Sequence, residues 1–454
     1  MQVSARTSLT ALRARLMKAG HPASSAEQLA PGFRRAATSL GDVASGGKGF
    51  AFFVPGRIEV LGKHTDYAGG SSLTCATTRG FCTVAAPLTS HALTIVHADT
   101  DETERIDLRD PSPTGTSHWS IYPRAVVRRV GQAVAQESED LLSGGTISFS
   151  STLPQAAGMS SSSALVIACY LALQALNNLP DRPKFQEYLS NRSQVAAYLA
   201  AVESGRPFGP FAAGDGVGTE GGSEDHTAIL CSAPGALRRF SYDPIRLQQT
   251  VTLPDQWRFV IGDSAVKADK TGGAQSAYND ASQLAVQAAR HWREQAGSTA
   301  RHLGAVMREN GFSMSRLRRV LRTAADSPDP LIQRAKHFHT ENQEILPAAM
   351  EALGAGDWDA FGALVDRSQK AADTLLGNQV PETNHLAQSA RRLGAVAASS
   401  FGAGFGGAVW ALVARTEAEA FRSAWRADYS THFPERAASA RFFTEQPGPA
   451  AFQL

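Results

Sequence analysis

The sequence lacks the features that mark several large classes of protein. Four cysteines among 454 residues are too few to build a disulfide scaffold, and none forms the Cys-x-x-Cys pair of a zinc knuckle. Strong charge of either sign is also missing, because 44 Lys and Arg stand against 42 Asp and Glu, a formal net charge of +2. Nucleic-acid binding is therefore not favoured, since it would require a strongly basic surface.

A hydrophobic run long enough to cross a membrane is also missing. The most apolar stretch, residues 164–176, reads ALVIACYLALQAL. As a helix it would extend roughly 20 Å, short of the ~30 Å hydrocarbon core of a bilayer. Residues 1–20 are basic and amphipathic without the apolar core of a secretory signal, so they predict a surface helix, with a transit peptide as the minor alternative. We expect a cytoplasmic protein with reduced cysteines and no membrane contact.

At about 150 residues per domain, a chain of 454 residues predicts two or three domains. Hydrophobic residues make up 43 % of the chain, which argues against disorder. Residues 20–48 are rich in Gly, Ala and Ser and predict a connector. Short β-branched segments predict strands over residues 50–153, and helical periodicity follows over 160–204 and 276–390. This order predicts an α+β fold of two lobes.

Four consecutive serines, Ser160–Ser163, open the apolar stretch, and Pro154 and Gly158 precede them. Free N–H groups and the positive end of the dipole at a helix start favour phosphate, and serine hydroxyls can add a metal contact. Serine is also an ordinary helix cap, so anion binding and simple capping are equally good interpretations of this segment alone. The segment is not a Walker motif, because no Gly-Lys-Ser/Thr follows.

Two further segments carry unusual chemistry. Residues 54–70, VPGRIEVLGKHTDYAGG, place charged and aromatic side chains between glycine turns after an apolar strand, where burial is costly unless they are paired or bound. A solvated loop is the simpler alternative, although we favour a site. Residues 402–407, GAGFGG, allow either a tight turn or the close approach of backbone to a ligand.

Taken in this order, the segments resemble the GHMP kinase superfamily and, within it, the galactokinase family. GRIEVLGKHTDYAGG is similar to the galactokinase signature GRxNxxGEHxDYxxG. PQAAGMSSSSA is similar to the phosphate-binding PxGxGLSSSA, and FGAGFGGAV to the C-terminal GAGFGG. The resemblance extends over roughly residues 50–415, most of the chain. An ordered set of motifs is far more specific than any one of them.

The resemblance implies a fold and an activity. The expected fold has two lobes, a ribosomal S5-like N-terminal lobe and a ferredoxin-like C-terminal lobe, with the active site in the cleft between them. On this chain they become residues 49–235 and 236–454, after an N-terminal helix and connector over 1–48. The family transfers the γ-phosphate of ATP, with Mg²⁺, to the anomeric hydroxyl of a sugar. The expected partners are therefore a sugar and ATP, and the expected assembly is a monomer or weak homodimer.

The resemblance also assigns the nucleotide site residue by residue. The phosphate-binding segment comprises Pro154, Gly158, Met159, Ser160, Ser161, Ser162 and Ser163. One of Ser161 and Ser162 would hold Mg²⁺ together with Glu203, which ends a helical stretch. Apart from the resemblance, Glu203 would be interpreted as a solvated carboxylate at a helix end.

For catalysis, the resemblance to the family segment GGxxDQ points to Asp225, which lies three residues after Gly222. Asp225 would accept the proton of the sugar hydroxyl, and Arg57 beside it would keep that carboxylate ionised. Asp215 and Glu224 are the competing carboxylates of the same loop. The expected sugar contacts are Arg57, Lys63, His64, Asp66, Gly222, Asp225 and Tyr278, although His64 is almost equally well interpreted as a buried, hydrogen-bonded histidine.

Several positions depart from the family pattern, and three of them carry side chains of different chemistry near the expected sugar and base. Glu59 replaces an Asn, His226 replaces a Gln, and Lys63 replaces the Glu that accepts a hydrogen bond from the sugar's 6-hydroxyl. An ammonium has three donors and no acceptor, so a uronic acid such as galacturonate becomes an alternative substrate to galactose. Alternatively, Glu59 and Lys63 pair with each other and galactose is accepted as usual.

Two other function classes are alternatives to a sugar kinase. Some relatives bind sugar and ATP as non-catalytic sensors, but these commonly alter the serine motif, which is intact here. A GHMP kinase for mevalonate or homoserine is disfavoured by the HTDYAGG and SAYND segments.

Overall fold

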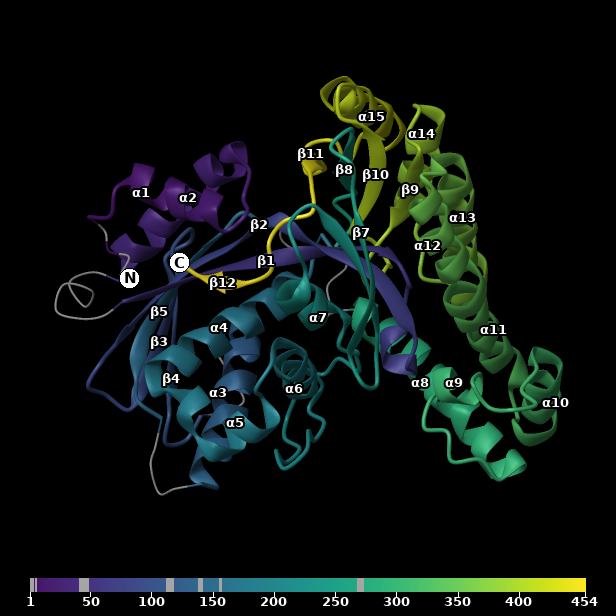
Figure 1. Ribbon diagram of the computed structural model, residues 1–454, viewed down its shortest axis with the longest axis horizontal. Helices are drawn as coiled ribbons and strands as arrows, with labels where there is room; N and C mark the ends of the chain where they lie inside the picture. The colour runs from purple at the N-terminus through teal and green to yellow at the C-terminus, as the bar shows by residue number, and fades with distance from the viewer. Residues whose placement is uncertain are drawn as a thin grey trace.

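The computed structural model describes residues 4, 6–40, 49–111, 118–137, 142–154, 157–267 and 273–454. It has two lobes, each built on its own β-sheet (Figure 1). The predicted α+β class and two-lobed architecture are confirmed. Within the described ranges, no helix has the length and apolar character needed to cross a membrane.

The first lobe is organised by a long antiparallel hairpin. Its strands, β1 (Phe50–Leu61) and β2 (Ser71–Pro87), lie at the centre of an eight-stranded sheet and are buried over nearly all their length. The main path of the sheet runs β12-β1-β2-β5-β3-β4, while β6 pairs with β2 and β7 pairs with β6. The other strands are β3 (Ala92–His97), β4 (Glu102–Asp107), β5 (Gly145–Ser151), β6 (Ala236–Ser241), β7 (Arg246–Thr252) and β12 (Phe452–Gln453).

Helices cover both faces of this sheet (Figure 1). One face carries α1 (Leu9–Lys18) and α2 (Ala23–Ser39), and α4 packs on the opposite face against β1 and β2. The helices of this second layer are α3 (Ile121–Ala135), α4 (Ser161–Asn177), α5 (Pro183–Tyr188), α6 (Arg192–Ser204) and α7 (Glu224–Cys231). Burial on both faces explains why the central strands are apolar without strict alternation.

The connector predicted over residues 20–48 is wrong for much of its length, because α2 occupies residues 23–39. Small residues that indicated a loop instead allow the helix to pack closely on the sheet. A β-carbon added at Gly32 would lie 3.1 Å from the Cys82 Sγ. The end of the predicted connector, residues 41–48, lies outside the described residues.

The second lobe has a four-stranded antiparallel sheet in the order β11-β8-β10-β9. Its strands are β8 (Trp257–Asp263), β9 (Ala397–Ser400), β10 (Ala408–Ala414) and β11 (Arg441–Glu445). Alternate residues of β10 point to opposite sides: Val409 joins a core with α14 and α15, and Trp410 joins the core that includes Phe361 of α13. The helices α12 (Leu346–Ala355), α13 (Trp358–Ala371), α14 (Pro381–Arg392) and α15 (Ala418–His432) flank this sheet.

A separate helical group extends from the second lobe and has its own small core around Trp292. It comprises α8 (Gly273–Ala296), α9 (Leu303–Val306), α10 (Met314–Ala324) and α11 (Pro328–His339). Between α11 and α12 the chain forms a π-helical turn, η5 (Thr340–Ile345).

The lobes do not divide the chain where the sequence predicted, after residue 235. Strands β6 and β7 belong to the first sheet, and the C-terminal β12 returns to pair with β1. The segment between β11 and β12 therefore crosses from one lobe to the other. Glu445 fixes this crossing, because its Oε1 accepts hydrogen bonds from the Thr78 backbone N–H at 2.9 Å and from the Thr78 hydroxyl.

We predict that Glu445→Ala lowers the free energy of unfolding by about 1–3 kcal/mol, because two buried donors of Thr78 lose their acceptor. Glu445→Gln keeps an acceptor oxygen and should lose clearly less. Urea denaturation of the three proteins measures both differences. Equal stability of the wild type and the Ala variant would show that this contact does not hold the crossing segment.

Candidate active site

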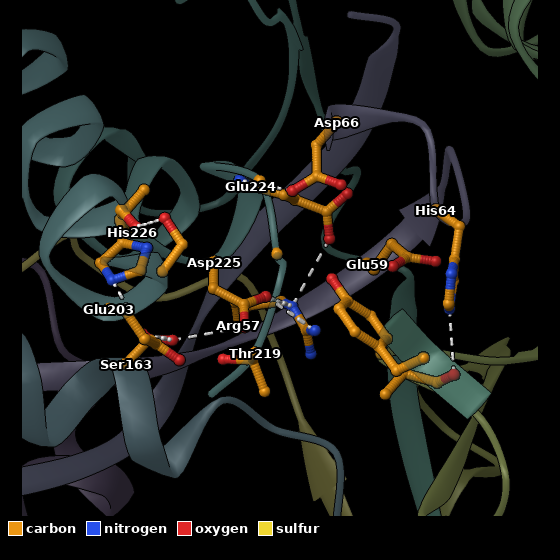
Figure 2. A pocket seen from close by; sticks show the side chains of 17 residues that line it. Arg57, Glu59, His64, Asp66, Ser163, Glu203, Thr219, Glu224, Asp225 and His226 are labelled. Atoms are coloured by element: carbon orange, nitrogen blue, oxygen red, sulfur yellow. Dashed lines mark hydrogen bonds and ion pairs between the residues drawn. The ribbon is translucent and has the colours of Figure 1, made fainter. Parts of the chain in front are cut away.

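A cavity forms where β1, α4, α6 and α7 of the first lobe meet the 402–403 turn of the second. Figure 2 shows its charged side chains converging from these elements. It contains eight of the predicted site residues: Arg57, His64, Asp66, Ser163, Glu203, Gly222, Asp225 and Tyr278. The other described lining residues are Glu59, Ala200, Ser204, Thr219, Gly221, Glu224, His226, Gly402 and Ala403.

At the centre of the cavity, Arg57 and Asp225 form a buried ion pair. The Arg57 Nε donates to Asp225 Oδ1 at 2.9 Å, and Nη2 lies 2.8 Å from the same oxygen. The remaining Nη1 donates to the carbonyl of Gly158. Burial alone would lower the pKa of Arg57, but Asp225 and Glu224 raise it overall. The guanidinium therefore stays charged beside the carboxylate predicted as the base.

The local fold explains how Arg57 reaches this position. The pairing of β1 with β2 shifts register between Pro55 and Arg57, and the Arg57 backbone N–H leaves the ladder to donate to the Met159 carbonyl at 3.3 Å. A bulge of this kind turns a strand side chain toward a new direction. It ties β1 to the serine segment in front of α4.

The serine segment makes a tight turn into α4. Ser160 has a left-handed backbone (φ 59°), and its buried hydroxyl has no hydrogen-bond partner among the described residues. Gly158 also has a positive φ of 72°, and a β-carbon at Gly402 would lie 2.8 Å from the Gly158 carbonyl oxygen. The two glycine-rich segments of the sequence therefore pack directly against each other, one from each lobe. Residues 155 and 156 lie outside the described residues.

Beside Asp225, three side chains form a second buried cluster, which the left part of Figure 2 shows. The Ser163 hydroxyl donates to Glu203 Oε2 at 2.9 Å and lies 3.4 Å from Asp225 Oδ2. The His226 Nε2 is 3.0 Å from the same Glu203 oxygen. Ser163 stands where the family pattern SSSA has its Ala, and His226 where it has Gln. Two departures from the pattern thus meet at one carboxylate.

The predicted sugar-binding loop is held by aromatic and backbone contacts. His64 has a left-handed backbone (φ 55°), and its Nε2 donates to the Ala403 carbonyl at 3.0 Å. Its Nδ1 is then left to accept from the Tyr67 hydroxyl at 2.8 Å. Tyr278 packs against both rings, with centroids 5.0 and 5.9 Å away. His64 thus lines the cavity and is also buried and hydrogen bonded, while its contact with a sugar stays a prediction.

Asp66 and Gly222 meet at the far side of this loop. A β-carbon at Gly222 would lie 2.3 Å from Asp66 Oδ2, so only glycine fits there. The same Asp66 oxygen accepts from the Glu224 backbone N–H at 3.1 Å.

Sequence reasoning missed Arg334, which supports this loop from α11. It is 2 % exposed and donates to the His64 carbonyl and, at 3.2 Å, to the Tyr67 hydroxyl. The only signal in the sequence was its place in the RAKHFHTENQ segment, which gave no role.

Lys63 is not among the residues that line the cavity. Its ammonium is buried and donates to the Ser399 hydroxyl at 2.7 Å and to the Ser368 hydroxyl at 3.2 Å, both in the second lobe. The alternative of a Glu59–Lys63 pair is not found either, since these two described residues make no ion pair within 4.0 Å. Lys63 is therefore not placed to bind the carboxylate of a uronic acid in this cavity.

The competing carboxylates of the catalytic loop are now separated. Asp215 has a 77 % exposed side chain and pairs with Arg128, outside the cavity. Glu224 lies inside the cavity, 3.6 Å from Arg57, and burial raises its pKa well above the usual range. Asp225 differs from both in its direct contact with Arg57 at 2.8 Å, which favours it as the base.

The residues present also fit a magnesium–nucleotide complex. Among the described residues, no group of three or more His, Cys, Asp and Glu side chains is placed to hold a metal. Magnesium bound with a nucleotide needs fewer protein ligands, because phosphate oxygens and waters supply the rest. Glu203 and the hydroxyls that open α4, including the unpartnered Ser160, provide a donor set of this kind.

Three family profiles match the chain. The galactokinase galactose-binding signature covers residues 44–87, the GHMP kinase N-terminal domain 124–209 and the GHMP kinase C-terminal domain 349–431. Among curated proteins, the galactokinase of Actinobacillus succinogenes is 28 % identical over 376 residues, covering 82 % of this chain and 86 % of that protein. The galactokinase of Roseiflexus sp. is 29 % identical over 377 residues, covering 81 % and 84 %.

Solved structures share the fold. Lactococcus lactis galactokinase complexed with galactose matches with a TM-score of 0.72 at 22 % identity, over 92 % of this chain and 98 % of that one. Methanococcus jannaschii mevalonate kinase matches with a TM-score of 0.53 at 13 % identity, over 88 % and 99 %. With all three profiles in the order that the motifs predicted, the resemblance of this chain to the galactokinase family of the GHMP kinase superfamily is confirmed.

Proposed function

We propose that this protein is an ATP-dependent sugar 1-kinase that phosphorylates the anomeric hydroxyl of galactose or a closely related neutral hexose. The observation that carries the proposal is the buried Arg57–Asp225 pair, which lies between the serine turn before α4 and the loop around Asp66. A base with a fixed cation between a phosphate-binding turn and a hydroxyl-binding loop is the arrangement that phosphoryl transfer to an alcohol requires. The similarity to curated galactokinases supports the same activity.

In the proposed reaction, Asp225 accepts the proton of the sugar hydroxyl as the hydroxyl oxygen attacks the γ-phosphorus of ATP. The bond from that phosphorus to the β-phosphate oxygen breaks, and ADP leaves. Arg57 offsets charge on the phosphoryl oxygens and keeps Asp225 ionised. The backbone N–H groups after Gly158 and the hydroxyls of Ser160 to Ser162 bind the phosphates. Asp66, His64, Gly222 and Tyr278 orient the sugar. Most of the acceleration comes from positioning and electrostatics, because the protein forms no covalent bond to the substrate.

Magnesium, when bound with ATP, neutralises charge on the phosphates and orients them. Glu203 with Ser161 or Ser162 is the proposed protein contribution to magnesium binding, and Ser163 holds the Glu203 carboxylate in place.

The four cysteines are free thiols, which is consistent with the reducing environment of the cytoplasm. A monomer or weak homodimer stays a prediction.

A panel of sugars tests the activity directly. With ATP and magnesium, we expect turnover of galactose and none of galacturonate, because the cavity is lined by carboxyl groups that repel an anionic sugar. Phosphorus NMR should place the new phosphate on the anomeric carbon. No turnover of any sugar, with sugar and nucleotide still bound in calorimetry, would instead support a non-catalytic sensor.

A pair of Asp-to-Asn variants tests the base. We expect Asp225→Asn to reduce kcat by about 10²–10⁴-fold, because the amide cannot accept the proton. Asp215→Asn, in the same loop but paired with Arg128 at the surface, should retain full activity. Nucleotide affinity, measured by calorimetry, should be similar in both. An Asp225→Asn enzyme with wild-type kcat would exclude Asp225 as the base.

A further inference from the structure

Glu59 lies inside the cavity although no motif assigns it a role. It is 3 % exposed and lines the cavity with Arg57 and Asp66. The strand that carries it is fixed, because the Glu59 carbonyl accepts from the Trp410 Nε1 at 3.1 Å. Figure 2 shows the Glu59 carboxylate on the side of His64, with the Arg57–Asp225 pair between it and the Ser163–Glu203 cluster. Glu59 thus lies on the side of the cavity that contains the sugar-binding loop.

One oxygen of this carboxyl group lacks a partner. Glu59 Oε1 is buried and makes no hydrogen bond to any described residue. Lys63, which the sequence offered as a partner for Glu59, donates instead to Ser399 and Ser368. A buried acceptor without a donor is costly, and in a ligand cavity the missing donor can come from the ligand.

Charge decides which ligand group suits this position. Five carboxyl groups line the cavity (Glu59, Asp66, Glu203, Glu224 and Asp225), and Arg57 is the only Lys or Arg among the described lining residues. Burial raises the pKa of Glu59 to about 7, and the charge of Glu341 acts in the same direction. Lys63, Arg57 and a hydrogen bond with the Glu224 carboxyl act to lower it, and this bond leaves Oε1 without a partner. The carboxyl groups of the cavity would repel an anionic ligand group, whereas a hydroxyl donates a hydrogen bond without adding negative charge.

We propose that Glu59 is a substrate-contacting residue, whose Oε1 accepts a hydrogen bond from one hydroxyl of the sugar and so makes this cavity selective for a neutral hexose. The inference rests on the proposed function, and it adds a contact at a position where the family pattern has Asn. In the family pattern, the hydrogen-bond acceptor for the sugar is the Glu that stands where this chain has Lys63. In this protein, Glu59 would supply an acceptor instead.

Three variants separate a substrate contact from a structural role. Glu59→Leu removes the acceptor, and Glu59→Gln keeps an acceptor oxygen without the charge. The matched control is Glu341→Gln: Glu341 is also fully buried and has an unpartnered Oε2, but it does not line the cavity. Thermal unfolding of each variant identifies any general loss of stability.

We expect Glu59→Leu to raise the KM for galactose about tenfold, the effect of one lost hydrogen bond to a buried group, with the KM for ATP unchanged. Glu59→Gln should recover most of this loss, and Glu341→Gln should leave both KM values at the wild-type level. An unchanged KM for galactose in Glu59→Leu would overturn the proposal.

Deoxygalactoses, each lacking one hydroxyl, locate the contact. For the sugar that lacks the hydroxyl bound to Glu59, the wild type and Glu59→Leu should have equal KM values. If every deoxy sugar shows the same tenfold difference, Glu59 acts through the shape of the cavity and the proposal is wrong.

Calorimetric binding of galactose keeps this test independent of catalysis. If the wild type turns over no sugar but binds galactose, and Glu59→Leu binds it about tenfold more weakly, the proposed activity fails while the role of Glu59 is supported. If galactose binds equally to both, or to neither, the role of Glu59 is overturned.

Discussion

The buried guanidinium of Arg57 is the constraint on which the rest of the site depends. At 3 % exposure it has lost its water, and every N–H that would have been hydrated needs an acceptor from the protein. Those acceptors come from two separate elements, the Gly158 carbonyl before α4 and the Asp225 carboxylate at the start of α7. Removing one partner of a buried ion pair costs about 3–5 kcal/mol, so the three elements are held in one arrangement. The proposed catalytic geometry and the packing of these elements therefore depend on the same contact.

The substrate side of the cavity is braced in a different way, by contacts between the lobes. His64 donates to Ala403, Lys63 to Ser399, and Trp410 to the Glu59 carbonyl, so residues of β1 and the following loop are tied to the second sheet. Ala403 belongs to the glycine-rich turn at 402–407, and Ser399 and Trp410 lie in the two strands that flank it. The three contacts therefore fix Glu59, Lys63 and His64 relative to this turn. Because both glycine segments meet at Gly158 and Gly402, the phosphate side and the sugar side are fixed relative to one another.

Much of this could be predicted from the sequence because motif residues are contiguous. Arg57, Asp66 and the serine motif are recognised from local spacing, and the structure brings Arg57, Asp66 and Ser163 to one cavity. Side-chain direction was not predictable: Lys63 is in the expected loop, but it faces Ser399 because two hydroxyls of the second lobe solvate its ammonium.

Long-range partners left still less trace in the sequence. Arg334 lies 270 positions from His64, so nothing local indicated their contact. The small residues of α2 predicted a loop. As a helix they pack closely on a sheet whose strands lie far away in the sequence, so local composition could not indicate this packing.

The distribution of charge in the cavity poses a problem that the arrangement itself answers. A kinase must bring the highly charged phosphates of ATP close to a site lined here by five carboxyl groups. Like charges in a cavity of low dielectric repel strongly, so the two must be kept apart. The N–H groups and serine hydroxyls that open α4 are the proposed phosphate site. Glu59, Asp66 and Glu224 lie on the other side of Arg57 from Ser163 of α4, as Figure 2 shows.

Arg57 lies between these two sides, as the only permanent cation among the described lining residues. A neutral sugar placed there separates the acids from the phosphates and supplies hydroxyl donors to the acids. A neutral substrate is then needed to bring the sugar hydroxyl, the base and the ATP phosphate together, in addition to any effect of neutrality on the affinity for the sugar. On this argument the carboxyl groups of the cavity contribute to catalysis by what they exclude as well as by what they bind.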